Sequence, residues 1–196
     1  MTPVRLVLID DDAQVLSALT RLLRQGLAVA PRTLGIDAFA DPQLALTRMR
    51  ERAVDLVICD YRMPRLDGIA LLSQLARSHP DTVRILLTGS PDLQAVLRAV
   101  NNAGVAQVLL KPWDNAELLA VVRKGLDARG ALLEQRRLAD TARQATGTLT
   151  PQDIERRRLE AQWPGITQVE WADDGAVQFS DSGLIPLDTP THRHEH

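Results

Sequence analysis

The sequence predicts an α/β protein built on a five-stranded, doubly wound parallel sheet, with a small helical and β-hairpin extension at the C-terminus. Short apolar runs alternate five times with segments whose apolar residues recur at helical spacing, which is typical of a parallel sheet covered on both faces. Four of the five apolar runs end abruptly at a polar residue. The 196 residues, 45% hydrophobic and 24% charged, suffice for one globular domain and an extension.

The first βα unit begins the chain. Residues 4–9 are apolar and β-branched and predict a strand, and the leucines of residues 13–24 recur at helical spacing. Between the two stand Asp10, Asp11 and Asp12. Three adjacent carboxylates at the end of a buried strand repel one another and are costly to desolvate, so we expect a cation or solvent beside them.

The second unit is weaker in sequence. Residues 33–39 predict a strand with few strongly apolar positions. Asp41 and Pro42 are the residue types preferred at the N-cap and the first position of a helix, and that helix is expected to reach about residue 52.

The third strand carries the sharpest feature of the chain. Residues 56–59 form an apolar run that stops at Asp60, and a turn through Met63-Pro64 and Asp67-Gly68 follows. A buried strand that ends in a carboxylate presents it at the carboxyl edge of the sheet, where open α/β folds bind their ligands. An aspartate after a strand also commonly caps a turn, so Asp60 alone does not identify a site.

The remaining units repeat the pattern and add two polar strand ends. A strand over residues 83–87 ends in Thr88, and one over residues 105–110 ends in Lys111. Because the carboxyl ends of parallel strands lie on one edge of the sheet, the polar strand ends should converge although they are far apart in the sequence. Helical spacing predicts the accompanying helices over residues 69–78, over residues 91–103 and from Asp114 onward.

These motifs together resemble the receiver domain of two-component response regulators. The segments that carry the resemblance are LIDDD, ICDYRMPRLDG, LLTGS and VLLKPW, in this order and spacing, and it covers roughly residues 1–128. Each motif alone is weak, whereas the combination is highly specific. The resemblance implies the flavodoxin-like fold with strand order 2-1-3-4-5, in agreement with the pattern of elements.

The resemblance also implies a chemistry for the strand ends. Asp60 would be the nucleophile that a histidine kinase phosphorylates, in a site that requires Mg2+. Asp11, Asp60 and the backbone carbonyl of Arg62 would hold the metal directly and Asp10 through water, a set of hard oxygen ligands. Lys111 and the hydroxyl of Thr88 would contact the phosphoryl oxygens.

Two features restrict what the resemblance implies. Val108 stands three residues before Lys111, where many receivers carry an aromatic residue that follows the threonine during the switch. Trp113 either supplies an aromatic side chain to the same face or is a packing residue. Arg62 and Ser90, two positions after Asp60 and Thr88, are expected to flank the entrance to the site.

The C-terminal third is less informative. We predict an extended helix or linker over residues 129–147, a small helix and β-hairpin module over 148–180, and a flexible tail over 181–196. Gly125 and Gly130 are expected to interrupt the helical pattern. Two interpretations of the extended helix stay open, since it either pairs two chains in a homodimer or lies on its own domain. Output is expected through contact with a downstream protein or a second copy.

Composition narrows the function class. A single cysteine, Cys59, excludes a disulfide framework, and the absence of a long apolar run predicts a cytoplasmic protein without membrane contact. The formal charge of -2 and the acidic C-terminus make DNA an unlikely partner. The alternative is a DNA-binding transcriptional regulator with a divergent output domain. An aspartyl phosphohydrolase is less favoured because Arg62 stands where it needs a second carboxylate, so no enzyme activity is expected beyond self-phosphorylation and self-dephosphorylation.

Overall fold

The predicted fold is confirmed by the computed structural model, which describes residues 4–27, 33–64, 66–89, 103–145, 150–162, 170–171 and 177–178. Five parallel strands form one sheet in the order β2-β1-β3-β4-β5. The strands are β1 (Val4–Ile9), β2 (Leu34–Phe39), β3 (Leu56–Asp60), β4 (Val83–Thr88) and β5 (Gln107–Leu110). The central strand β3 is buried at every residue, as its continuous apolar run predicts.

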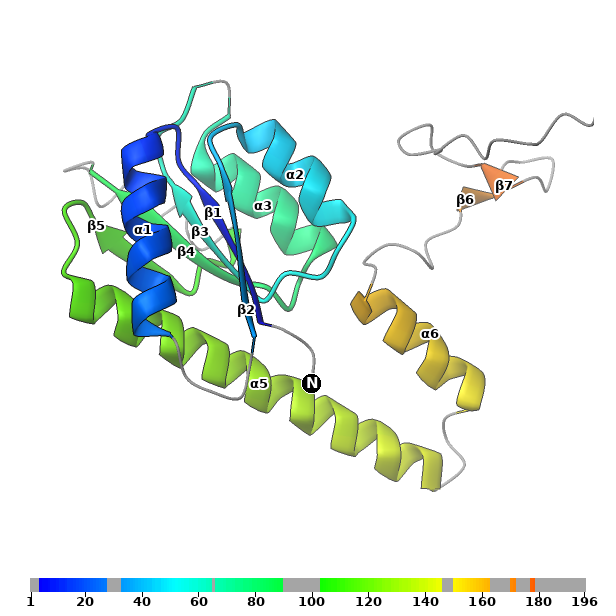
Figure 1. Cartoon of the computed structure of the whole chain (residues 1–196). Helices are drawn as coiled ribbons and strands as arrows, with labels where there is room; N and C mark the ends of the chain where they lie inside the picture. Colours follow the sequence, from blue (N-terminus) through cyan, green and yellow to red (C-terminus); the bar gives the residue numbers. More distant parts are fainter. Residues whose placement is uncertain are drawn as a thin grey trace, which may run out of the picture.

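Helices cover both faces of the sheet (Figure 1). On one face lie α1 (Ala13–Gly26) and the start of α5 (Asn115–Ala145), and on the other lie α2 (Pro42–Arg50) and α3 (Gly68–Ser78). The two faces have separate apolar cores, each of which contains alternate side chains of the strands. The predicted helix over residues 91–103 falls outside the described part of the chain, except for Ala103.

Four of the helices begin at an aspartate whose carboxylate accepts a backbone N–H of the first turn. Asp12 caps α1, Asp41 caps α2, Asp67 caps α3 and Asp114 caps α5. Asp12 therefore has a structural role as a helix cap, whereas the capping of α1 does not involve Asp10 or Asp11.

The C-terminal region begins as one uninterrupted helix. The expected interruptions at Gly125 and Gly130 are wrong, because α5 continues through both glycines to Ala145. Gly125 lies so close to the sheet that a Cβ atom there would stand 2.8 Å from Cγ1 of Val83, which explains a glycine at this point. After α5 come α6 (Pro151–Gln162) and a short antiparallel hairpin of β6 (Glu170–Trp171) and β7 (Val177–Gln178), both of which the sequence predicts.

His79 is a buried histidine at the C-cap of α3. Its Nε2 atom lies 2.8 Å from the carbonyl oxygen of Met49, and its Nδ1 atom lies 2.8 Å from Oγ of Ser78. Burial lowers the pKa of His79 below its ordinary value of 6.5, and the charges of Arg50 and Arg84 lower it further, against the opposing bond to Met49. The folded protein therefore favours the neutral imidazole.

We expect the folded protein to lose stability as the pH falls below about 6.5. Between the unfolded-state and folded-state pKa values, His79 binds a proton in the unfolded chain but not in the folded protein, so acid favours unfolding. The loss of stability levels off once the pH lies below the folded-state pKa. Urea denaturation at about pH 8 and about pH 5.5 measures the effect as a lower midpoint in acid. The difference between the two midpoints should shrink in His79→Gln, and an undiminished difference would contradict the assignment to His79.

Candidate functional site

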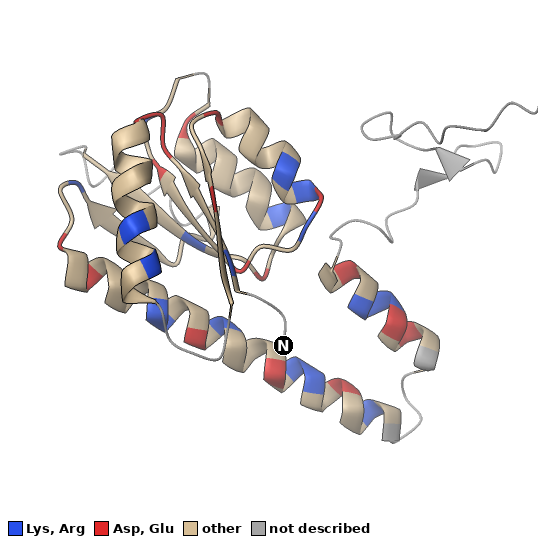
Figure 2. Cartoon of the chain, in the orientation of Figure 1, with Lys and Arg blue, Asp and Glu red and all other residues tan. Residues whose placement is uncertain are grey.

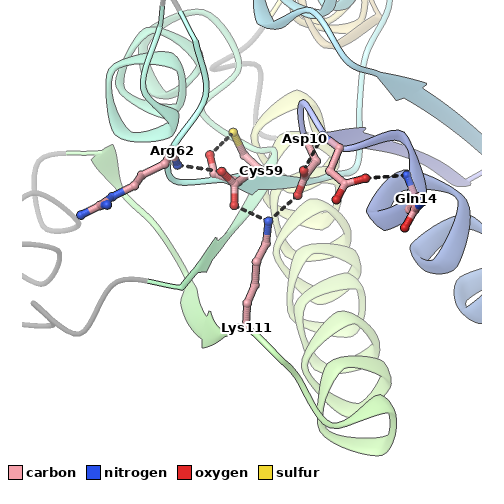
Figure 3. A network of polar contacts seen from close by, with 7 residues as sticks. Asp10, Gln14, Cys59, Arg62 and Lys111 are labelled. Carbon is pink, nitrogen blue, oxygen red and sulfur yellow. Dashed lines mark hydrogen bonds and ion pairs between the residues drawn. The ribbon is translucent and has the colours of Figure 1, made fainter.

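Three of the predicted site residues meet at the carboxyl edge of the sheet (Figure 3). The Nζ atom of Lys111, after β5, lies 2.6 Å from Oδ2 of Asp10 and 2.5 Å from Oδ1 of Asp60. Asp10 follows β1 and Asp60 ends β3, so adjacent strands supply the two carboxylates. Lys111 reaches both from the far side of β4. The sequence predicted this convergence, but not the direct pairing of Lys111 with Asp10.

Asp60 is held from two sides. Its Oδ2 atom accepts the backbone N–H of Arg62 at 2.7 Å, while Oδ1 faces Lys111. The Cys59 thiol donates to the carbonyl oxygen of Asp60 at 3.2 Å. The carboxylate is thus fixed in direction, yet Asp60 remains 6% exposed, whereas Cys59 is 0% exposed. Because burial raises the pKa of the Cys59 thiol well above its ordinary range, that thiol is not a competing nucleophile.

The turn after Asp60 requires a glycine. Gly68 donates its backbone N–H to the carbonyl oxygen of Tyr61 at 2.9 Å. A Cβ atom at Gly68 would collide with the backbone carbonyl of Asp60. The Asp67-Gly68 pair of the motif is thereby explained, since Asp67 caps α3 and Gly68 lets the helix start directly beneath the site.

Burial and pairing act in opposite directions on the charged groups. Burial raises the pKa of Asp10 despite its bonds to Lys111 and to the backbone N–H of Asp12. For Lys111, burial favours the neutral amine, but the hydrogen bonds and charges of Asp10 and Asp60 outweigh it and raise the pKa. Lys111 therefore stays protonated, and the pair of carboxylates carries more negative charge than one lysine neutralises.

The remaining residues singled out in the sequence lie around this cluster or outside the described part of the chain. Thr88 is fully buried at the end of β4, and its carbonyl oxygen accepts the backbone N–H of Lys111 at 2.8 Å. Val108 and Trp113 are both partly buried, and Trp113 packs against the core on the α1 and α5 side. This contact favours the packing interpretation of Trp113. Ser90 lies outside the described residues.

Asp11 is exposed. Within the residues that the structure describes, no three His, Cys, Asp or Glu side chains come together closely enough to hold a metal ion. The chemistry of the donors nevertheless fits Mg2+, because they are carboxylate and carbonyl oxygens around a buried site with excess negative charge.

Comparison with known proteins gives two curated relatives of different kinds. Hydrogenase transcriptional regulatory protein HoxA of Cupriavidus necator is 31% identical over 143 residues, which cover 73% of this chain and 28% of HoxA. Protein-glutamate methylesterase/protein-glutamine glutaminase 5 of Anaeromyxobacter dehalogenans is 36% identical over 111 residues, or 56% of this chain and 29% of that protein. The chain thus spans less than a third of either relative.

These names bear on two expectations. HoxA is named as a transcriptional regulator, so the relatives do not support the expectation that DNA is an unlikely partner. The second relative is named as an enzyme, so the expectation of no enzymatic output stays a prediction.

No helix in the described ranges is long and apolar enough to cross a membrane.

Solved structures and a family model agree on the domain itself. The signal receiver domain of an HD domain-containing protein from Pseudomonas fluorescens Pf-5 matches with a TM-score of 0.60 and 35% identity, covering 68% of this chain and 94% of that one. The model of the response regulator receiver domain matches residues 6–123, more than half of the chain. The chain therefore belongs to the response regulator receiver domain family.

Proposed function

We propose that the chain is a phosphoacceptor that a histidine kinase phosphorylates on Asp60. The observation that carries the proposal is the fixed, solvent-reaching carboxylate of Asp60, held between the Lys111 ammonium at 2.5 Å and the Arg62 backbone N–H at 2.7 Å. Such a carboxylate is oriented for attack and has a cation beside it. Membership of the receiver family supports the same chemistry.

In the proposed reaction, a carboxylate oxygen of Asp60 forms a bond to the phosphorus of a phosphohistidine. The bond from phosphorus to the imidazole nitrogen breaks, and its electron pair stays on that nitrogen. Phosphoryl transfer depends mainly on positioning and on neutralisation of charge. Lys111 would supply a fixed positive charge to the phosphoryl oxygens, and the Thr88 hydroxyl would bind one of them.

Asp11, Asp60 and the backbone carbonyl of Arg62 would hold Mg2+ directly, with Asp10 binding it through water. The ion would neutralise negative charge between the carboxylate and the incoming phosphoryl group. Incubation with acetyl phosphate, with and without Mg2+, followed by intact mass measurement, tests the proposal. A gain of one phosphoryl group only when Mg2+ is present is expected.

Transcriptional regulation is the output that the relatives favour over protein contact alone. The match to HoxA covers 143 of the 196 residues, so wherever it begins it must include residues 54–143. The likeness to HoxA therefore continues along α5 beyond residue 123, where the match to the receiver family ends. The competing proposal, output through contact with a downstream protein or a second copy, draws support from the mixed charges of α5 and α6 (Figure 2). We place either output in the cytoplasm.

The two outputs differ in their expected response to salt. If the chain acts on DNA, phosphorylation should produce binding to a promoter-length duplex whose affinity falls steeply as salt rises, by about one power of salt for each phosphate contact. If it acts through a second copy, light scattering should show a phosphorylation-dependent rise in mass without DNA binding. The chain ending at Ala145 serves as the control, because it keeps α5 and removes α6 and the hairpin.

A further inference from the structure

The opposite edge of the sheet, away from Asp60, carries a second set of polar contacts, all directed at α5. Arg129 forms an ion pair with Asp55, and its Nε atom donates to the carbonyl oxygen of Asp81 at 2.8 Å. About two turns further along the helix, Nη1 of Arg136 lies 2.5 Å from Oδ1 of Asp81. Two arginines on one face of α5 therefore contact two aspartates of the sheet edge.

Asp55 is bonded to the backbone of two strands of the sheet. Asp55 accepts the backbone N–H of Arg5 on its Oδ2 atom at 2.7 Å, and its own carbonyl accepts the N–H of Val83 at 3.0 Å. Its pair with Arg129 is half-buried, with side-chain exposures of 21% and 16%. Screening by solvent is weaker there than for the exposed pairs along α5.

The positions of Asp55 and Asp81 relate this edge to the phosphorylation site. Asp55 immediately precedes β3, which ends in Asp60, and Asp81 stands two residues before β4, which ends in Thr88. The two strands that present the proposed phosphoacceptor and switch residue at one edge thus present the two aspartates at the other. Close-packed strands can transmit a shift along their length because the protein interior has low compressibility.

We propose that Asp55 and Asp81 form a clamp, together with Arg129 and Arg136, that fixes the direction in which the helical rod of residues 137–145 leaves the domain. The clamp makes the rod move with β3 and β4 rather than as a free linker. Arg129 and Arg136 both lie beyond the family match, which ends at residue 123. The sequence left open whether this helix pairs two chains or lies on its own domain. In the structure, α5 lies on its own domain as far as Arg136.

A distance measurement between the domain and the rod tests the clamp. Spin labels are attached at Arg77→Cys on α3 and Gln144→Cys on α5, both exposed positions, while Cys59 is fully buried. The full chain should give a narrow distance distribution, and Asp55→Asn with Asp81→Asn should broaden it. The double variant Arg129→Gln with Arg136→Gln changes only the helix side of the clamp and should broaden the distance distribution to the same extent. Both double variants should keep the circular dichroism spectrum of a folded protein.

The matched control is Glu134→Gln. Glu134 pairs with Arg137 at 2.7 Å within the same stretch of α5 but does not contact the sheet edge, so its loss should leave the distribution narrow. Exchange of charges in Asp81→Arg with Arg136→Asp should restore part of the order lost in Asp81→Asn. A distribution that stays narrow in both double variants, or broadens equally in Glu134→Gln, would overturn the clamp.

The coupling of the clamp to phosphorylation rests on the proposed function, and the same samples separate the two. After acetyl phosphate and Mg2+, intact mass reports whether the chain is labelled. A labelled chain whose mean distance shifts, with the shift lost in the clamp variants, supports the coupling. A labelled chain with an unchanged distance overturns the coupling and leaves the proposed function standing, whereas an unlabelled chain overturns both and leaves the clamp to be decided by the unphosphorylated comparison.

Discussion

Replacement of Asp60 by Asn should abolish phosphorylation by acetyl phosphate or by a kinase. The amide keeps the shape of the side chain and an oxygen that accepts the Arg62 backbone N–H, which donates to Asp60 at 2.7 Å. It removes the anionic oxygen that attacks phosphorus. Intact mass should therefore show one added phosphoryl group on the parent chain and none on the variant.

Asp67→Asn is the matched control for this substitution. Asp67 lies in the same loop and caps α3 by accepting the backbone N–H of Ala70 at 2.7 Å, a role that asparagine also fulfils. This variant should gain the phosphoryl group as the parent does. Equal labelling of the parent and of Asp60→Asn would move the phosphoacceptor to another residue.

Replacement of Asp11 by Ala should slow phosphorylation by roughly 100-fold, which corresponds to about 3 kcal/mol of lost charge stabilisation. Asp11 is exposed and has no capping role, so the effect would come from weakened Mg2+ binding rather than from misfolding. Labelling rates measured across a range of Mg2+ concentrations should show that the variant needs far more metal. Removal of Mg2+ by a chelator should abolish labelling of the parent.

Asp12→Ser separates this effect from a general loss of negative charge. The change removes one carboxylate from the neighbouring position but keeps a side chain that can cap α1, where Asp12 accepts the N–H of Gln14 at 2.7 Å. Its labelling rate and Mg2+ dependence should resemble those of the parent. If Asp11→Ala labels as fast as Asp12→Ser at every Mg2+ concentration, the proposed metal ligand is wrong.

Most of the sheet was predictable because each strand and helix has a local signal. The apolar runs that end at Asp60, Thr88 and Lys111 locate three strands, and the fixed topology of a parallel sheet brings their ends to one edge. Boundaries were less accurate. Asp60 and Thr88 are the last residues of β3 and β4, since their backbones are still paired with Leu87 and Leu110.

What could not be predicted depends on contacts between distant residues. The ion pair of Lys111 with Asp10 has no local signal, because it depends on the spacing of strands across the sheet. The continuity of α5 was missed for a different reason. Gly130 lowers intrinsic helix propensity by about 1 kcal/mol, but docking on the sheet and the ion pairs of Arg129 and Arg136 favour the helix on either side of it.

The continuity of α5 also determines where this chain can be shortened. A chain cut at the end of the family match, residue 123, would end within α5 before Gly125 contacts Val83. It would also leave the half-buried Asp55 carboxylate without Arg129, its ion-pair partner. The smallest unit that keeps every contact between α5 and the sheet therefore extends through Arg136, and a receiver prepared to the family boundary would be a less stable protein than the one this sequence encodes.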